Sequence, residues 1–346
     1  SVRLRVEKIN SIFNSTFSKL WIGAQLNLID CKIDQEGFYV PSMVVLEPDY
    51  LIDASAIAEC FQNYGNSSLH YFRRKFETVG NSHYLLLGNL ANFFLDELIY
   101  SDHPKTLKFE DVFKKSFNEM PFEFTACKDI QSPVAFRDFM FRANRHFENI
   151  KRVVSEDMSA SGFSLDQCVL EPSFYSETFG FQGRLDMLQT TATDSFTRIV
   201  ELKSGKPPWP QDDTTKIAPN HESQTSVYRL MIQSVLVKKA RDIYAMILYS
   251  SADFKGQNLR LSAPYKQLEK EIVNLRNEIV SLEHQLYMGD GHTVEEVFDL
   301  LFDSESYSNR VPEFFEARLE EMRKVLLKSS EIEKTYFYRF ISFVTR

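Results

Sequence analysis

The chain has 346 residues, of which 43% are hydrophobic, 25% charged and 14% aromatic, and its formal net charge is −8. This ordinary composition excludes collagen-like, mucin-like and wholly disordered chains, and the negative charge excludes a global positive field that would attract a polyanion. No apolar run reaches the roughly 18 to 20 residues of a membrane helix, and the N-terminus has no signal-peptide core. We therefore expect a soluble intracellular protein with no membrane partner.

Helix signals dominate the first half of the chain. Residues 1–84 mix short alternating runs with helix signals, where Asp53 or Ser55 could cap a helix, and we expect a small strand and helices there. Residues 85–100 are apolar nearly all round, which predicts a buried helix. Ser132 and Pro133 form an N-cap and first-turn pair, which predicts the start of a long amphipathic helix.

The outer faces of this long helix carry a basic stripe, which consists of Arg137, Arg142, Arg145, Lys151 and Arg152. Such a stripe is most often a solvated face, and contact with nucleic acid is the alternative. Two residues of the proline-rich loop at 206–219 have a similar pair of interpretations. Trp209 and Lys206 either pack within the loop or contact a base and a phosphate.

From residue 169 the apolar period changes from that of a helix to that of strands. Three strands, a helix and a further apolar strand are predicted, at residues 169–177, 181–189, 197–203, 221–239 and 243–249. The polar run 190–195 is predicted to be a turn. Residues 268–286 carry a heptad seam that predicts a helix, and the chain from there to residue 346 is expected to be helical.

Two carboxylates and a lysine fall on neighbouring strands of this pattern. Glu201 and Lys203 are two apart in one strand and therefore share a face, while Leu202 points to the core. If the preceding strand pairs antiparallel with this one, Asp186 lies beside Glu201. Two carboxylates and one amine then converge.

Adjacent carboxylates repel each other unless a cation neutralises them, and Mg²⁺ or Mn²⁺ with oxygen ligands does so. We expect Asp186, Glu201 and the backbone carbonyl of Leu202 to be metal ligands, and Lys203 to stabilise developing charge. This equipment suits hydrolysis of a phosphodiester. Because the residue types are common, a solvated hairpin is the alternative.

The helix that follows the proline-rich loop adds further polar side chains. Gln224 and Tyr228 are four residues apart, so they share one helical face and can both reach the carboxylates. His221 near the start of this helix is predicted to be a cap or a surface residue, with metal binding as the alternative.

The runs GRLD, ELKSGK and HESQTSVY resemble the PD-(D/E)xK nucleases of the RecB type. The similarity is greatest to the nuclease domain of the helicase-nucleases that trim Okazaki-fragment flaps and resect DNA ends, and it spans residues 47–232. It implies an α/β (α+β) fold with a restriction-endonuclease-like αβββαβ core. We expect this core at residues 85–263, an N-terminal extension at 1–84 packed on it, and a C-terminal helical region at 264–346.

The resemblance also implies roles for individual residues. Asp186 and Glu201 would be metal ligands, Lys203 the catalytic lysine, and Gln224 and Tyr228 the motif that supports the site. The substrate implied is DNA with a single-stranded portion, cut with Mg²⁺ or Mn²⁺. The chain is therefore expected to be a deoxyribonuclease of DNA repair or replication, in the cytoplasm or nucleoid.

In the relatives a helicase follows the nuclease on the same chain. The present sequence contains no GxxxxGK[ST] loop and begins with Ser1 rather than Met, which agrees with a fragment of a longer chain. We expect the partners to be DNA, as a single strand or a flap, and a helicase domain on the same polypeptide.

Two departures from the family pattern affect these expectations. Many RecB-type enzymes have GxxxH in the helix before the core, whereas this chain has Gly88 and Asn92 at the two positions. We expect Asn92 to be a weak or outer metal ligand. The alternatives are that Asn92 only packs within the helix, or that Asp96, one turn later, is the ligand. The relatives also hold an iron–sulfur cluster with one cysteine before the core and three after it. Cys60 matches the first, but no cysteine follows Cys168, so no cluster is predicted.

The four cysteines, Cys31, Cys60, Cys127 and Cys168, stand singly and give no support for a zinc site or a disulfide framework. The 30 phenylalanines exceed ordinary usage, and we expect them largely on the helices outside the core. A catalytically weakened nuclease fold that binds DNA for a helicase is the main functional alternative, and a restriction or CRISPR-adaptation nuclease is a third. Cleavage polarity and the choice between exonuclease and endonuclease stay open.

Overall fold

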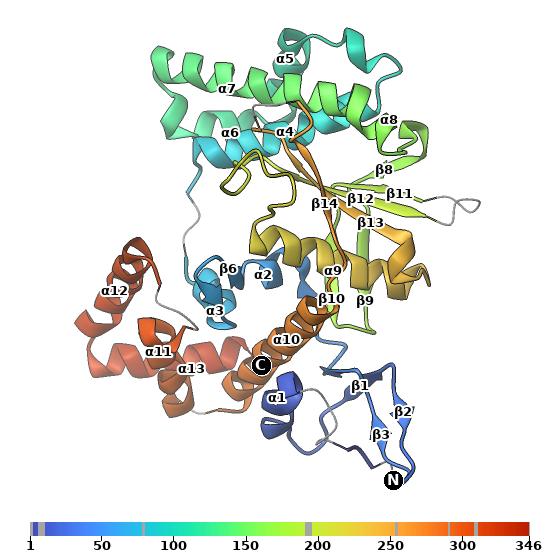
Figure 1. Cartoon of the computed structure of the whole chain (residues 1–346). Helices are drawn as coiled ribbons and strands as arrows, with labels where there is room; N and C mark the ends of the chain where they lie inside the picture. Colours follow the sequence, from blue (N-terminus) through green and yellow to red (C-terminus); the bar gives the residue numbers. More distant parts are fainter. Residues whose placement is uncertain are drawn as a thin grey trace. The chain divides into compact units, whose positions relative to one another are not determined.

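A mixed five-stranded sheet forms the centre of one of two compact units of the chain (Figure 1). The computed structural model describes residues 3–5, 11–77, 80–190, 196–252, 255–289, 291–307 and 311–345. The unit with the sheet consists of Thr78–Phe174 and Arg184–Pro264. The other unit consists of Ser1–Glu77, Tyr175–Gly183 and Tyr265–Arg346, so segments from both ends of the chain share it.

The five strands lie in the order β14, β13, β12, β11, β8. The central pair β12 and β13 is parallel, and every other pair is antiparallel. The strands are β8 (Cys168–Leu170), β11 (Met187–Gln189), β12 (Thr197–Lys203), β13 (Ile243–Tyr249) and β14 (Leu259–Ser262). The predicted strands at 197–203 and 243–249 are confirmed with their boundaries.

Side chains of β12 alternate between the two faces of the sheet. Val200 and Leu202 belong to the apolar core formed with the helices on one face. The intervening Glu201 points to the opposite face, where it meets the helix α9 (Pro219–Val235). The predicted alternation of Leu202 and its acidic neighbour is therefore confirmed.

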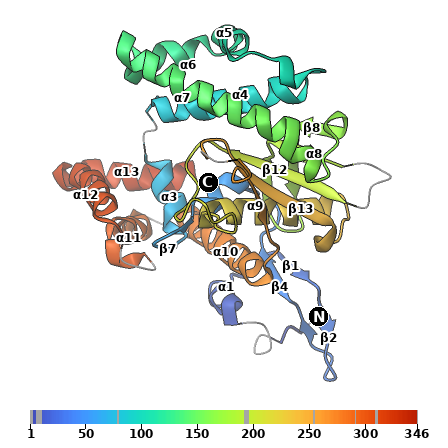
Figure 2. The ribbon, with the colours of Figure 1, turned by 45° about the horizontal axis from the view of Figure 1, so that its top comes forward.

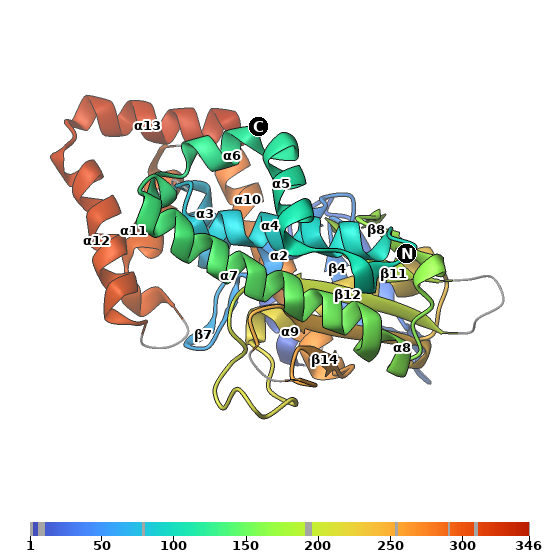
Figure 3. The same ribbon diagram turned by 90° about the horizontal axis from the view of Figure 1, so that it is seen from above.

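A layer of helices covers the first face of this sheet, and α9 covers the second (Figures 1 and 3). Within the layer, α4 and α7 run side by side (Figure 2). The layer consists of α4 (His83–Ile99), α5 (Phe109–Glu119), α6 (Pro121–Ala126), α7 (Pro133–Arg152) and α8 (Met158–Ala160). The buried helix and the long amphipathic helix of the sequence are confirmed as α4 and α7, and the side chain of Ser132 caps α7 by accepting from the amide of Ala135.

Phenylalanine rings fill this helical layer. Phe94, Phe109, Phe113, Phe124 and Phe147 contact one another through edge-to-face, tilted and stacked pairs. Residues 85–263 contain 17 of the 30 phenylalanines. The prediction that they lie largely on the helices outside the core is therefore wrong: the layer that covers the sheet is itself built from them.

The second unit combines short strands with helices from both ends of the chain. Its strands are β1 (Leu26–Ile29), β2 (Lys32–Ile33), β3 (Tyr39–Val40), β4 (Met43–Leu46), β5 (Ile52–Asp53), β6 (Phe61–Gln62) and β7 (Gly65–Asn66). Its helices are α1 (Asn14–Ser18), α2 (Ala54–Ala58), α3 (Leu69–Lys75), α10 (Lys266–Met288), α11 (Gly291–Phe302), α12 (Glu313–Lys328) and α13 (Glu331–Val344). Asp53 caps α2, as predicted, through a 2.8 Å hydrogen bond from the amide of Ser55.

The predicted heptad helix is confirmed as α10, and it joins the two ends of the chain. The guanidinium of its fully buried Arg276 donates to the backbone carbonyls of Leu46, Glu47, Tyr50 and Gly180. Burial lowers the pKa of Arg276 to about 9. Gly180 has φ +68°, and a Cβ atom there would collide with the guanidinium, so this position requires glycine.

Two of the predicted strands are each divided in the structure. The prediction of one strand at 169–177 is wrong because Glu171 has φ +52° and breaks it into β8 and β9 (Ser173–Ser176). Likewise 181–189 is divided into β10 (Phe181–Arg184) and β11, and β5, β10 and β9 form a separate small sheet. Residues 191–195 of the predicted turn lie outside the described residues.

The helix predicted at 221–239 is α9, which begins two residues earlier and ends at Val235. Its end precedes Val237, whose φ of +51° cannot continue a helix. Among the described residues, no helix is long and apolar enough to cross a membrane.

Candidate active site

The acidic pair lies where β11 and β12 meet. Asp186 directly precedes β11, and the pairing of Met187 with Val200 places it opposite Glu201 on the antiparallel neighbour. The predicted antiparallel pairing is confirmed. The carboxylate of Asp186 accepts a 2.6 Å hydrogen bond from the amide of Leu202. The backbone of β12 therefore fixes the position of the first carboxylate.

Lys203 and α9 complete a continuous hydrogen-bond network. Lys203 Nζ donates to Glu201 Oε1 and to Gln224 Oε1, both at 2.8 Å. The amide nitrogen of Gln224 donates to Glu201 Oε1 at 2.7 Å and to the hydroxyl of Tyr228 at 2.8 Å. The hydroxyl of Tyr228 donates to the carbonyl of Arg184, two residues before Asp186, at 3.0 Å. All five site residues named from the sequence thus lie together.

The charges in this network are not balanced. Burial, followed by the negative charge of Glu201, raises the pKa of Asp186 well above its ordinary value. Lys203 donates a 2.8 Å hydrogen bond to Glu201, and its positive charge acts on the carboxyl of Asp186 against the effect of burial. Glu201 is 4% exposed, and its Oε2 atom is buried without a hydrogen-bond partner among the described residues. A buried carboxylate oxygen of this kind is costly unless a cation or donor meets it.

These observations fit a hard divalent cation. The groups that could hold it are oxygen donors: the carboxylates of Asp186 and Glu201 and the carbonyl of Leu202. The peptide of Leu202 lies at the site, since its amide contacts Asp186. In the part of the chain that the structure describes, no three His, Cys, Asp or Glu side chains converge on one point. The two carboxylates of Asp186 and Glu201 correspond to the one or two that commonly hold Mg²⁺ in proteins.

Asn92 lies on α4, on the face that turns toward the end of β12. One turn before it, a Cβ atom on Gly88 would lie 3.4 Å from Ser204 Oγ, just beyond Lys203. One turn after it, the pKa of Asp96 is raised to about 6 by burial and by the charges of Glu171 and Glu97. The Oδ1 atom of Asn92 is buried with no hydrogen-bond partner in the described part of the chain. An unpaired oxygen suits an outer ligand, although no hydrogen bond joins Asn92 to the acidic pair within these residues.

His221 and Tyr249 were not assigned to the site from the sequence. Tyr249 pairs in register with Lys203 across the parallel strands, and its hydroxyl lies 2.8 Å from His221 Nδ1. Burial and the charge of Lys203 lower the pKa of His221 to about 3, so its ring is neutral. The interpretation of His221 as a cap or surface residue is wrong. The sequence signal that could have predicted this contact is the position of His221, one helical turn before Gln224 and therefore on the same face of the helix.

The basic stripe of α7 divides between two roles. Lys151 donates to the carbonyl of Leu107, and Arg152 donates to the side chain of Asn258, so these two cations serve packing. Arg142 and Arg145 instead line a cavity with Lys206, which follows β12.

Trp209 is 86% exposed, so the prediction that it packs within its loop is wrong.

Comparisons with known proteins add little to what the geometry of the site indicates about function. No family model matches the chain, and no curated protein matches it. A solved structure named "Putative exonuclease", from Eubacterium rectale, is similar at 11% identity and a TM-score of 0.40, over 68% of this chain and 81% of that one. Because this likeness is so distant, the functional argument depends on the site alone.

Proposed function

We propose that this chain is a divalent-metal-dependent DNA nuclease that hydrolyses phosphodiester bonds in single strands or flaps. The observation that carries the proposal is the convergence of Asp186, Glu201 and Lys203 with an unsatisfied oxygen on Glu201. Two carboxylates beside one lysine, at one end of the inner strands β11 and β12, form a site for a cation and a phosphate together.

Each residue of the network has a role in this proposal. Asp186 and Glu201 would hold Mg²⁺ or Mn²⁺, with the carbonyl of Leu202 and, more weakly, Asn92. When bound, such an ion polarises a phosphoryl oxygen and lowers the pKa of a bound water. The ammonium of Lys203 stabilises the negative charge that develops on the phosphate.

Gln224 and Tyr228 would act as positioning residues. The amide of Gln224 holds the charged ends of Lys203 and Glu201 in place, and Tyr228 fixes that amide against the carbonyl of Arg184. Three elements, β10, β12 and α9, are thereby joined around the place where the phosphate would react. Such fixed geometry is what catalysis of phosphodiester hydrolysis needs from the protein.

The order of elements supports a PD-(D/E)xK core of the RecB type. A helix, α4, precedes the strands β8, β11 and β12, and α9 and β13 follow them. This order agrees with the αβββαβ pattern of that family. We propose a role in DNA repair or replication inside the cell, with a helicase attached to the same chain.

A catalytically weakened module that binds DNA for a helicase is the second candidate. It is favoured by Asn92, which stands where many relatives have a histidine ligand, and by the ion pair through which Lys203 already neutralises Glu201. The two candidates differ in metal binding. An inert module would show no Mn²⁺ binding that depends on Asp186.

Lys203→Ala tests the proposal with Lys115→Ala as a matched control. Both lysines form an ion pair with a glutamate in the same unit, Lys203 with Glu201 and Lys115 with Glu97. We expect Lys203→Ala to reduce Mn²⁺-dependent degradation of single-stranded DNA by about 100-fold or more, and Lys115→Ala to leave it unchanged.

Calorimetry with Mn²⁺ on the wild type and on Asp186→Asn separates the two candidates. Loss of the binding heat in the variant supports the nuclease. Equal DNA degradation by wild type and Lys203→Ala would refute the assignment of the site.

A further inference from the structure

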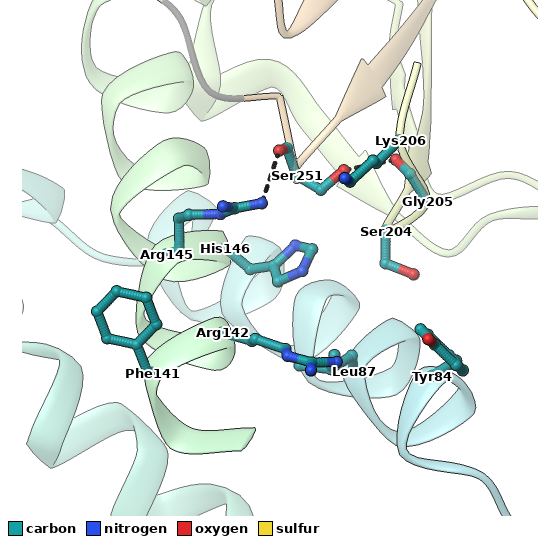
Figure 4. A pocket seen from close by; sticks show the side chains of 10 residues that line it. All are labelled: Tyr84, Leu87, Phe141, Arg142, Arg145, His146, Ser204, Gly205, Lys206 and Ser251. Atoms are coloured by element: carbon teal, nitrogen blue, oxygen red, sulfur yellow. Dashed lines mark hydrogen bonds between the residues drawn. The ribbon is translucent and has the colours of Figure 1, made fainter. Parts of the chain in front are cut away.

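A basic cavity lies beside the candidate active site, within the same unit of the chain (Figure 4). Its volume is about 500 Å³, which is within the range of small-ligand sites. α4, α7 and the segments that follow β12 and β13 line it. The residues used below are Tyr84, Phe141, Arg142, Arg145, His146 and Lys206.

The cavity is positively charged although the chain as a whole is acidic. Arg142, Arg145 and Lys206 line it, and among the described residues that line it there is no Asp or Glu. Within the described residues, neither Arg142 nor Lys206 forms an ion pair. Arg142 lies 3.2 Å from His83 Nε2, and the other nitrogen of that ring is bound to Asp129. Arg142 is thus held by His83, and no ion pair among the described residues neutralises Arg142 or Lys206, which favours an anionic ligand.

Two aromatic rings are exposed at the same cavity. Tyr84 is 68% exposed and Phe141 is 72% exposed. Figure 4 shows the two rings on opposite sides of Arg142, with His146 and Lys206 above it in this view. Exposed rings interleaved with cations are the usual equipment for binding single-stranded nucleic acid, because an unpaired base can stack on the ring while its phosphate meets a cation.

The wall of the cavity is rigid. His146 is buried, and its Nδ1 atom lies 2.8 Å from Ser250 Oγ. The side chain of Asn149 donates to the carbonyls of Ser250 and Ala252, and Arg145 donates to the carbonyl of Ser251 at 3.3 Å. α7 is thereby fastened to the end of β13.

The cavity is close to the catalytic lysine. Lys206 is three residues after Lys203, so their Cα atoms are at most about 11 Å apart even in extended chain. The amide of Ser250 donates to the carbonyl of Lys203 at 3.0 Å, which joins the wall of the cavity to the site. The cavity therefore lies next to the end of β12 that carries Lys203.

We propose that this cavity binds one segment of a single nucleic-acid strand and positions that strand for cleavage. Arg142, Arg145 and Lys206 contact its phosphates, and Phe141 or Tyr84 stacks on an unpaired base. A base-paired duplex cannot offer a free base face to these rings, so the cavity selects single strands. The inference deepens the proposed function, since it names the residues that hold the substrate of that site.

Binding without cleavage tests the cavity independently of catalysis. Fluorescence anisotropy with labelled oligothymidylate is measured in EDTA, on protein that carries Lys203→Ala. We expect Arg142→Ala with Arg145→Ala to weaken binding about tenfold or more, and to lower the slope of log K against log salt by about 0.7 for each cation removed. Arg137→Ala is the matched control, because Arg137 is an exposed cation of the same helix that does not line the cavity.

Phe141→Ala tests the stacking step, with duplex DNA and a free mononucleotide as competitors. We expect weaker binding of the oligonucleotide with an unchanged salt slope, and little competition by the duplex. Strong competition by the mononucleotide would show a nucleotide pocket and overturn strand binding. An equal loss in Arg137→Ala would show a general surface charge effect and overturn the cavity.

The failure of this inference and that of the proposed function give different results. If Mn²⁺ binding and cleavage depend on Asp186 and Lys203 while the Arg142 and Arg145 variants bind the strand normally, only the cavity is wrong. If the variants lose strand binding but no cleavage occurs in any condition, the cavity stands and the nuclease assignment fails.

Discussion

Gln224 is the residue on which the arrangement of the site depends most directly. Its side chain is buried and forms three hydrogen bonds, with Lys203, Glu201 and Tyr228. Gln224→Met keeps a side chain of similar length and helix propensity but removes all three. The substitution therefore measures how much the amide contributes to holding β12 and α9 together.

The expected loss of stability follows from the partners that remain. Hydrogen bonds to charged groups contribute about 1.5 to 3 kcal/mol each, and a neutral one about 1 kcal/mol. Lys203 and Glu201 keep their own ion pair, and the side chain of Lys203 is 22% exposed, so water can replace part of what is lost. The lower ends of these contributions total about 4 kcal/mol, and because water replaces part of this we expect the free energy of unfolding to fall by about 3 kcal/mol. For a unit of this size, that lowers the thermal midpoint by about 6 to 12 °C.

Gln233→Met provides the control, because it is the same substitution on the same helix. The amide nitrogen of Gln233 is buried without a hydrogen-bond partner among the described residues, so little is lost there. The assay is thermal unfolding followed by circular dichroism, together with calorimetry of Mn²⁺ binding. Equal shifts of the midpoint in both variants would refute the reasoning, since the effect would then not come from the network.

Two further predictions concern the other unit of the chain. Burial lowers the pKa of His70 from 6.5 to about 4, so as pH falls from 6.5 toward 4 the unfolded chain takes up a proton that the folded chain does not, and stability is lost. The ring of His70 lies among those of Tyr64, Tyr307 and Phe315. We expect the free energy of unfolding of His70→Phe to fall by up to about 3 kcal/mol less than that of the wild type between pH 7 and pH 4, as measured by urea titration. Parallel pH profiles of the two proteins would contradict this. Arg276→Met removes the donors to four backbone carbonyls and is expected to lower the free energy of unfolding by about 3 to 5 kcal/mol. The control is Arg241→Met at an exposed position, which should change the free energy of unfolding by under about 0.5 kcal/mol. A similar urea midpoint in both variants would contradict the role of the buried guanidinium.

Local periodicity was sufficient to predict the central part of the site. Glu201 and Lys203 share a face because side chains alternate along a strand, and Gln224 and Tyr228 share a face because they are one helical turn apart. The antiparallel pairing that brings Asp186 to Glu201 followed from the short connection between their strands. These relations involve near neighbours in the sequence, so pattern alone determines them.

Long-range pairing could not be predicted in the same way. The apolar pattern at 169–177 predicts one continuous strand. In the structure the backbone turns at Glu171, so the chain leaves one sheet and enters another. The amide of Glu171 donates to the carbonyl of Asp186. The different roles of Arg145 and Arg152 on one helix also depend on distant partners, Ser251 for the first and Asn258 for the second. Neither partner is marked in the sequence by spacing or residue type.

The net charge of −8 misled the sequence interpretation for a physical reason: charges act over a screening length of about 8 to 10 Å at ordinary salt concentrations. Beside Lys203 lie two buried carboxylates, and Lys206, three residues farther along the chain, lines a cavity together with Arg142 and Arg145. A metal ion at the first and a phosphate at the second would neutralise both, and each would bring the other closer to the reacting bond. Opposite local charges of this kind suit the ligand proposed above, a polyanion bound together with a metal ion, whatever the net charge of the whole chain.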